Sequence, residues 1–489
     1  MIDSAAISKI VEATVNECIN AGLLDGRGPG QRPGGMRAAP GPDPGQQAGR
    51  GAAGGGSVSA LVAQAKEAQR DFARMKLSER GLVIEALRGA AIESARMLAE
   101  DACRETGYGR VEDKEIKNLL AARNTPGIED LDTRAISGDD GLTLFELAPF
   151  GVIGSITPST NPAATIINNS ISMLAGGNAV VFNPHPAAAG VCRKTIDMLG
   201  RAASSAGAPR GLIGMPSEIS QESGIEIMNH PDIALLSVTG GEAIVNIAMK
   251  AGKKAIAAGP GNPPVIVDDT ADIAQASKDI VDGASFDNNV MCLSEKEAFA
   301  FESVADRLIE GMRANGAVLI GAGDVEKLAG TILSRTKGGH AIDRQYIGKD
   351  AEALLAAAGI PCGCRDPRLI ICETGPDHPF VLTEMLTPVL PVVRVGSIEE
   401  AIECALAAEG GCRHSAMMHS TNVRRLSQAA LAMNTTIFVK NAPSYAGNGF
   451  GGEGFTTMTI ATPTGEGLTS ARTFTRSRRC VLRGDFRIV

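Results

Sequence analysis

Short apolar runs rich in β-branched residues alternate with helix-length segments along most of the chain. In the first half, such runs cover 152–157, 179–182, 233–238 and 265–267. A second series extends from about 272 to 441, with runs near Ala298, Ala317, Leu369, Val389, Ala416 and Ile437. Strands that alternate with helices are typical of doubly wound parallel sheets. The pattern therefore predicts an α/β protein with two lobes.

The segment before these runs has a helical pattern. From Ser57 to about Leu120, apolar residues recur at helical spacing, for example at Leu82, Ala86, Leu87, Ala90 and Ala91. Residues 1–24 form a separate amphipathic stretch, whose apolar face would carry Ile7, Ile10, Val11, Val15, Cys18 and Ile19. Residues 25–56 between the two are dominated by Gly and Pro, which cannot build a core. We predict a short helix on a flexible linker.

The tethered helix could dock on its own protein or on a separate partner. A helix this short is marginal alone, and a long linker favours a separate partner. A membrane surface is disfavoured, because the polar face carries Asp3, Glu12 and Glu17 against the single cation Lys9.

Composition excludes several classes of function. The chain has 47 Lys and Arg against 55 Asp and Glu, a net charge of −8, which disfavours nucleic acid as a partner. No apolar run reaches the roughly 18 residues of a membrane span. The ten cysteines are scattered and no signal peptide precedes them, which indicates a reducing, cytoplasmic setting. Cys362 and Cys364 lack a second ligand pair, so we expect no metal site.

Ligands of doubly wound sheets bind at the carboxyl ends of the strands. Three predicted loops occupy such ends: 157–162, which begins with Thr157 and Pro158, 183–186, and 239–242. In the last of these, Thr239, Gly240 and Gly241 follow a strand and precede a helix, so their backbone N–H groups could meet a pyrophosphate. A plain strand-to-helix turn would have the same pattern.

One cysteine differs from the rest in its surroundings. Cys292 follows the polar turn 286–291, between a predicted helix and the strand near Ala298. An exposed, amide-rich loop is the setting in which a thiol becomes nucleophilic. From spacing alone, an inert loop thiol is the commoner case.

Several long motifs in order resemble the aldehyde dehydrogenase superfamily, and within it the coenzyme A (CoA)-acylating enzymes of bacterial microcompartments, which are propionaldehyde dehydrogenase-like. The motifs are GVIGSITPSTNPA (151–163), AGGNAVVFNPHPAAA (175–189), VTGGEAI (238–244), AGPGNPPVIVDD (258–269), NNVMCL (288–293), EMLTPVLPVV (384–393) and the C-terminal TPTGEGLTSARTFTRSRRCVL (462–482). The resemblance covers about 57–489.

This resemblance implies that Cys292 is the catalytic nucleophile. It also implies that the Cys292 backbone N–H and the Asn161 side chain hold the oxyanion, although Thr160 occupies the place of the Asn in hydrolytic relatives. Glu384 would bind the nicotinamide ribose. Asn183, followed by Pro184, replaces a Lys that binds the adenosine ribose in those relatives.

The resemblance also implies the reaction and its cofactors. Ala258 stands where hydrolytic relatives place a Glu general base, which favours CoA as the acyl acceptor and NAD as the oxidant, with NADP left open. The substrate would be propionaldehyde, or acetaldehyde as the alternative. A hydrolytic dehydrogenase and a scaffold without turnover are the rival interpretations. His414 and His419 have either structural or functional roles.

The implied organisation assigns 1–24 to targeting, 25–56 to the linker and 57–262 to the nucleotide-binding domain. Within that domain, about 131–149 would form an oligomerisation arm with the C-terminal strand. Residues 263–441 would form the catalytic domain, and 442–489 would return to the first domain. We expect a homo-oligomer, a dimer or a tetramer, inside a microcompartment, with a shell protein bound by residues 1–24.

Overall fold

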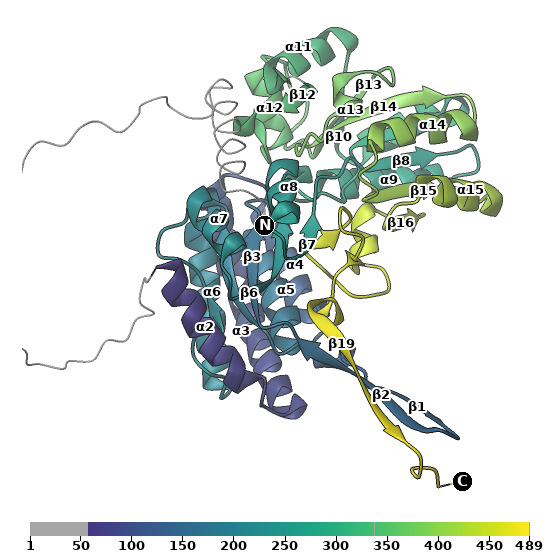
Figure 1. The fold of residues 1–489 in the computed structure, drawn as a ribbon. Helices are drawn as coiled ribbons and strands as arrows, with labels where there is room; N and C mark the ends of the chain where they lie inside the picture. Colours follow the sequence, from purple (N-terminus) through teal and green to yellow (C-terminus); the bar gives the residue numbers. More distant parts are fainter. Residues whose placement is uncertain (1–56, 337, 489) are drawn as a thin grey trace, which may run out of the picture. The chain divides into compact units, whose positions relative to one another are not determined.

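The computed structural model describes residues 57–336 and 338–488. The predicted targeting helix (1–24) and linker (25–56) lie outside the described residues. Figure 1 shows the described chain, which contains two parallel sheets and an antiparallel arm. Both α/β lobes and the arm are predicted correctly.

The N-terminal helical stretch is divided into three helices, not one. They are α2 (Val58–Phe72), α3 (Leu77–Thr106) and α4 (Val111–Asn124). Helix α2 begins where the Ser57 hydroxyl accepts the N–H of Ala60 (3.3 Å), and α3 ends at Gly107, whose φ of 70° is left-handed. Gly109 leaves no room for a side chain, because an added Cβ would lie 1.8 Å from Asp287 Oδ1. The break before α4 is therefore shaped by Asp287.

The first parallel sheet has five strands, all pairs parallel. In spatial order they are β5 (Ile213–Gly214), β4 (Ala179–Pro184), β3 (Val152–Thr157), β6 (Ile233–Thr239) and β7 (Lys254–Ala258). The associated helices are α5 (Pro162–Ala175), α6 (Ala189–Ser205), α7 (Gln221–Asn229) and α8 (Glu242–Lys250), with η2 (Pro186–Ala188) before α6. Strands β3 and β4 are buried along their whole length, as expected for a sheet covered on both faces.

The second sheet has seven parallel strands. In spatial order they are β10 (Ala317–Ile320), β13 (Leu369–Glu373), β14 (Val389–Val395), β9 (Glu297–Phe301), β8 (Pro264–Val267), β15 (Ser415–His419) and β16 (Ile437–Lys440). Its helices are α9 (Ile273–Ser285), α10 (Glu302–Ala314), α11 (Ala322–Ile332), α12 (Ala351–Ala357), α13 (Pro379–Leu382), α14 (Ile398–Glu409) and α15 (Val423–Met433). All strands expected from apolar runs in this region are present.

The arm is a three-stranded antiparallel sheet made from distant parts of the chain. It consists of β1 (Arg134–Gly138), β2 (Gly141–Pro149) and β19 (Thr475–Arg483), with β2 in the centre. Figure 1 shows the arm extending away from the helices around the first sheet. Its apolar residues Ile136, Val481 and Leu482 are exposed at 48%, 62% and 49%. The arm thus presents apolar surface that residues 57–336 and 338–488 do not cover.

Short elements complete the fold. They are the hairpins β11 (Leu333–Thr336) with β12 (Gly339–Ile342) and β17 (Ile460–Ala461) with β18 (Gly467–Leu468), and the turns η1 (Ile128–Asp130), η3 (Phe286–Asn289), η4 (Arg344–Tyr346), η5 (Ser444–Asn448) and η6 (Ala471–Phe474). Within 57–336 and 338–488, no helix is long and apolar enough to cross a membrane.

Candidate active site

The loops predicted at strand ends meet at one edge of the five-stranded sheet. Thr157, the last residue of β3, pairs with Pro184, the last residue of β4. Thr239 at the end of β6 pairs with Ala258 at the end of β7. Pro158 directly follows β3. Parallel pairing therefore collects Thr157, Pro184 and Thr239 at a single carboxyl edge.

This edge has free hydrogen-bonding capacity. Gly240 uses its N–H on the carbonyl of Ala258 (3.1 Å), whereas Gly241, the N-cap of α8, has no side-chain cap. An added Cβ at Gly241 would meet no atom within 4 Å. The buried Thr157 hydroxyl also has no hydrogen-bond partner among the described residues. An uncapped helix N-terminus beside an unsatisfied hydroxyl fits the phosphates and hydroxyls of a dinucleotide.

Asn183 is engaged within the protein. Its amide donates to the carbonyl of Ser220 (3.2 Å) and its carbonyl oxygen accepts from the Ser223 hydroxyl (2.7 Å). Both partners belong to the start of α7, so the Asn183 side chain orients that helix. The sequence did not predict this structural task, and a contact with a ribose stays a prediction.

Cys292 lies at the amino edge of the seven-stranded sheet, just before β9. The preceding turn η3 places Asp287, Asn288 and Asn289 consecutively in the left-handed region, with φ of 49°, 53° and 62°. Asp and Asn are the non-glycine residues that tolerate this conformation best. Their side chains are buried, so the prediction of an exposed loop is wrong.

The polar turn is buried because hydrogen bonds satisfy it. Asn289 donates to the carbonyls of Ala284 (2.7 Å) and Glu295 (2.8 Å). Lys296, itself fully buried, donates to the carbonyls of Asn289 (2.9 Å) and Met291 (3.0 Å). These bonds fix the backbone on the residues leading into Cys292.

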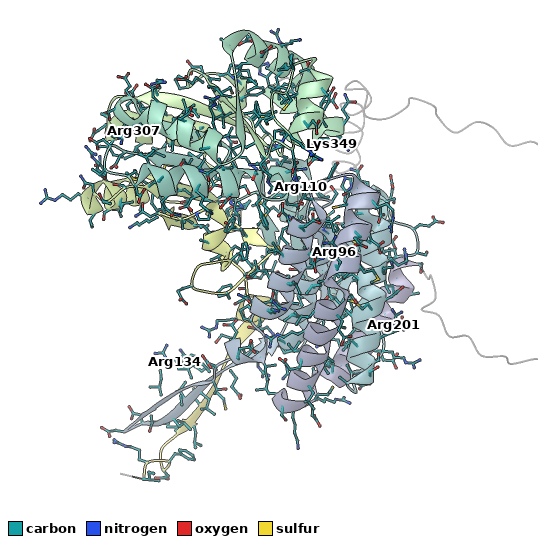
Figure 2. The ribbon with its side chains drawn as sticks, turned by 180° about the vertical axis from the view of Figure 1, so that it is seen from behind. Arg96, Arg110, Arg134, Arg201, Arg307 and Lys349 are labelled. Atoms are coloured by element: carbon teal, nitrogen blue, oxygen red, sulfur yellow. The ribbon has the colours of Figure 1, made fainter. Side chains whose placement is uncertain are left out.

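The turn is also tied to the start of α4. Asp287 accepts the backbone N–H of Arg110 (2.8 Å), and Asn288 donates to the carbonyl of Gly348 (2.9 Å). Lys349 donates to the carbonyl of Gly107 (3.0 Å), so Arg110 and Lys349 in Figure 2 mark where 107–110 meets 348–350. The segment before α4 therefore supports the turn from outside.

The surroundings of Cys292 disfavour its thiolate. Burial and, after it, the nearby Glu384 carboxylate raise the pKa of the thiol to about 12, although the charges of Lys296 and Lys117 oppose this shift. Burial also raises the pKa of Glu384, while Lys296 and the Gly261 N–H (3.3 Å) favour its charged form. Cys292 and Glu384 thus share one site, in which the resting thiol is protonated at neutral pH.

His414 and Cys292 both lie next to Gly261. An added Cβ on Gly261 would lie 2.7 Å from the Cys292 carbonyl oxygen and 2.9 Å from His414 Cγ. His414 Nδ1 hydrogen-bonds to the Ser415 hydroxyl (2.7 Å), and its buried Nε2 has no partner among the described residues. Burial lowers the pKa of His414 to about 4, so the ring is neutral.

His419 lies elsewhere. Its Nδ1 is 4.0 Å from Asp279 Oδ2 on α9, and burial lowers its pKa to about 4. Of the two histidines, His414 is the one that the structure places beside Cys292.

Asn161 is linked to the Cys292 turn through α4. It is the N-cap of α5, and its Oδ1 accepts a hydrogen bond from Lys117 Nζ. Lys117 also donates to Asp287 Oδ2, as does Lys114 (2.9 Å), whose Nζ reaches the Thr160 carbonyl as well (3.2 Å). The structure therefore connects Asn161 and the turn, which lie far apart in sequence.

Sequence reasoning missed Asp287, Lys117 and Lys296 as parts of the site. Asp287 and Lys296 lie within five residues of Cys292 in the sequence, and this closeness to the candidate nucleophile was the usable signal. Lys117 gave none, because a lysine in an amphipathic helix is ordinarily solvated.

The chain matches the model of the aldehyde dehydrogenase family over residues 44–465. The chain belongs to the aldehyde dehydrogenase family. The acetylating acetaldehyde dehydrogenase EutE of Salmonella typhimurium is 50% identical over 436 residues, 88% of this chain and 93% of that protein. Propanal dehydrogenase (CoA-propanoylating) of the same organism is 49% identical over 432 residues, 88% of this chain and 92% of that protein.

Solved structures of propionaldehyde dehydrogenases are similar to this aldehyde dehydrogenase. The Rhodopseudomonas palustris enzyme with bound CoA and an acylated cysteine is 46% identical, with a TM-score of 0.85 over 87% of this chain and 97% of that one. The enzyme from the fucose utilisation microcompartment of Clostridium phytofermentans is 46% identical, with a TM-score of 0.86 over 88% of this chain and 99% of that one.

Proposed function

We propose that this aldehyde dehydrogenase is a CoA-acylating enzyme that converts a short-chain aldehyde, CoA and NAD⁺ into acyl-CoA, NADH and a proton. The observation that carries the proposal is the identity of about half of the residues, over nearly their whole length, with enzymes named acetylating and CoA-propanoylating. The geometry around Cys292 and the first sheet supports it.

Cys292 is the nucleophile in this proposal. Its Sγ adds to the aldehyde carbonyl carbon, and the charge that develops on the oxygen is held by the Cys292 backbone N–H and the Asn161 amide. Because the thiol is protonated at rest, its proton must pass to a base as the bond forms, and the neutral ring of His414 is available to accept it. The positive charges of Lys296 and Lys117 stabilise the thiolate against burial and the Glu384 carboxylate.

The cofactor would lie along the carboxyl edge of the five-stranded sheet. When bound, NAD accepts the hydride that leaves the thiohemiacetal carbon, and a thioester remains on Cys292. Thr157 and Pro158, Asn183 and Pro184, and Thr239 to Gly241 would hold the dinucleotide, with Glu384 on the nicotinamide ribose. Whether NAD or NADP is preferred is decided by comparing kcat/KM for the two.

Ala258, the last residue of β7, supports CoA and not water as the acyl acceptor. The buried methyl group of Ala258, exposed at 3%, cannot act as a base for water. A CoA thiol ionises far more readily than water and is a better nucleophile, so thioester exchange proceeds without a strong base. His414 and the Cys292 carbonyl both lie next to Gly261, and the neutral His414 ring is available to accept the proton of the CoA thiol.

Omitting CoA is the test of the acceptor. With aldehyde and NAD⁺ alone, we expect at most about one NADH per active site, after which the acyl-enzyme persists. Adding CoA should restore steady turnover and yield acyl-CoA. The measurement is NADH absorbance after rapid mixing, together with the intact mass of the acylated protein.

Each rival has its own outcome in this assay. Sustained NADH and free acid without CoA would identify a hydrolytic dehydrogenase, with Glu384, which interacts with Cys292, as a candidate base. No NADH under any condition would favour a scaffold that retains the fold.

The aldehyde is proposed to be propionaldehyde, with acetaldehyde as the second candidate. One methylene in an apolar pocket changes binding by only about 1–3 kcal/mol, so both can react. The similarity to acetylating and propanoylating relatives is nearly equal. Comparing kcat/KM for aldehydes of two to four carbons decides the preference.

We also propose that the enzyme works in the lumen of a bacterial microcompartment, held by a shell protein that binds residues 1–24. Two observations support this: the similarity to a microcompartment enzyme, and the apolar face of Ile7, Ile10 and Val11 in the sequence. Ile10→Glu in a fluorescent protein fused to residues 1–24 is expected to weaken co-purification with intact shells, because it places a charge in the apolar contact. Failure of the unmodified fusion to co-purify would contradict the proposal.

The exposed apolar surface of the antiparallel arm supports the proposal that the protein is a homo-oligomer. Strands β1, β2 and β19 expose Ile136, Val481 and Leu482, and burying such apolar area in a second copy would stabilise the assembly. Light scattering of the intact protein distinguishes a dimer from a tetramer.

A further inference from the structure

Lys117 is a buried cation with two partners in the candidate site. Only 1% of the residue is exposed. Its Nζ donates to Asn161 Oδ1 and to Asp287 Oδ2. A buried ammonium group is costly, and it persists where its partners are fixed and oppositely charged. Lys117 is thus held by the Cys292 turn and in turn holds Asn161.

We propose that Lys117 is a positioning residue, which orients the Asn161 amide toward the oxyanion that forms on the Cys292 adduct. The inference rests on the proposed function, in which Asn161 is an oxyanion donor. Lys117 itself does not touch the substrate in this scheme.

The hydrogen bond from Lys117 fixes the orientation of the Asn161 amide, because only its oxygen, Oδ1, can accept from an ammonium group. With Oδ1 committed to an ammonium donor, Nδ2 must point to the opposite side. Among the described residues Nδ2 has one partner, the Thr160 hydroxyl at 3.3 Å, which is a long bond. An oxyanion would replace or join that weak acceptor easily. The positive charge of Lys117, which donates to Oδ1, also polarises the amide and makes its N–H groups stronger donors.

Lys114 provides a matched control on the same helix. It is equally buried, at 3% exposure, and it donates to the same Asp287 Oδ2 (2.9 Å). Its other bond goes to the Thr160 backbone carbonyl (3.2 Å) and not to Asn161. Both lysines therefore stabilise the turn, but only Lys117 contacts the amide.

The charge of Lys117 adds a pH signature. Burial and the neighbouring Lys114 charge lower the pKa of Lys117 to about 8, although the Asp287 carboxylate acts to raise it. Three other titratable groups interact electrostatically with the Lys117 ammonium: Asp113 on the same helix, Cys103 on α3 and Cys292. As pH rises through this pKa, the ammonium loses its charge and polarises Asn161 less. The benefit of having Lys117 should therefore shrink with rising pH.

The experiment is a double-mutant cycle on the full enzyme, read out as the rate of the NADH burst. Lys117→Met is expected to lower this rate about 10- to 100-fold, with KM for the aldehyde changed less than about threefold. In the Asn161→Ala background the same substitution should cost less than about twofold, because its target is gone. Lys114→Met should cost the same in both backgrounds. Lys117→Gln takes the place of Lys117→Met if the latter is not recovered folded.

The burst ratio of parent to Lys117→Met should also fall between about pH 7 and about pH 9. Equal losses in both Asn161 backgrounds, or a ratio that does not change with pH, would show a purely structural role and overturn the inference. A normal Asn161→Ala enzyme would instead refute the proposed oxyanion role. If only Asn161→Ala is impaired, Asn161 keeps that role without Lys117.

Discussion

Cys292→Ser is expected to reduce aldehyde-dependent NADH formation by at least about a thousandfold. A hydroxyl is much less acidic than a thiol, and Cys292 lies in a site that already disfavours the anion, with the pKa of the thiol raised to about 12 by burial and Glu384. Serine would therefore be almost wholly neutral. Binding of NAD⁺ should be unchanged, because Thr157 and Gly241 lie at the carboxyl edge of the five-stranded sheet, whereas Cys292 precedes β9 of the seven-stranded sheet.

A second cysteine serves as the control for this substitution. Cys412 is partly exposed. Its pKa is raised to about 11, mainly by burial and then by the Glu409 and Glu384 carboxylates. Cys412→Ser should retain NADH formation within about threefold. Burst amplitude and NAD⁺ titration of both variants are the measurements. An active Cys292→Ser enzyme, or an inactive Cys412→Ser enzyme, would contradict the assignment of the nucleophile.

The fold could be predicted where side chains carry a strand signal. Runs such as Val152–Thr157 are rich in β-branched residues and were found. Strand β7 (Lys254–Ala258) was missed, because alanines pack in a sheet without any β preference. The prediction of one long helical stretch to about Leu120 was too coarse, since the chain breaks between Phe72 and Leu77 and again between Gly107, the C-cap of α3, and Val111.

The site was predictable only in part. The rule for strand ends located Thr157 and Thr239, because one parallel edge collects them. Cys292 was singled out by its polar turn, but the burial of that turn was not visible. It depends on bonds from Arg110 and Lys117, which are about 170 residues away along the chain. Such pairings leave no pattern in one sequence.

Asp287→Ala is expected to lower the free energy of unfolding by about 3–5 kcal/mol, since it leaves buried cations unpaired. Asp287 Oδ2 accepts from both Lys114 and Lys117, and all three residues are at most 3% exposed. Oδ1 accepts the Arg110 N–H (2.8 Å), which would lose its partner too. Alanine also fits poorly at a φ of 49°.

Two variants separate these causes. Asp287→Asn keeps an acceptor and tolerates the left-handed backbone but removes the charge, so its loss should be intermediate. Asp350→Ala removes an Arg110 partner (3.0 Å) whose side chain is 54% exposed, and should cost less than about 1 kcal/mol. Urea unfolding followed by circular dichroism gives the three values.

The loss in Asp287→Ala should become smaller as pH rises toward about 8, the pKa of Lys117 in the parent, and should then stay constant. Burial already lowers the pKa of Lys117 to about 8 in the presence of Asp287, and removing that carboxylate lowers it further. Below about pH 8 the folded variant has already lost the Lys117 proton that the folded parent still holds, while both unfolded chains keep it, so the stability of the variant rises with pH relative to the parent. A loss that stays constant below that pH as well would show that the unpaired ammonium groups are not its cause. A loss below about 1 kcal/mol at neutral pH would show that Asp287 does not hold the turn together.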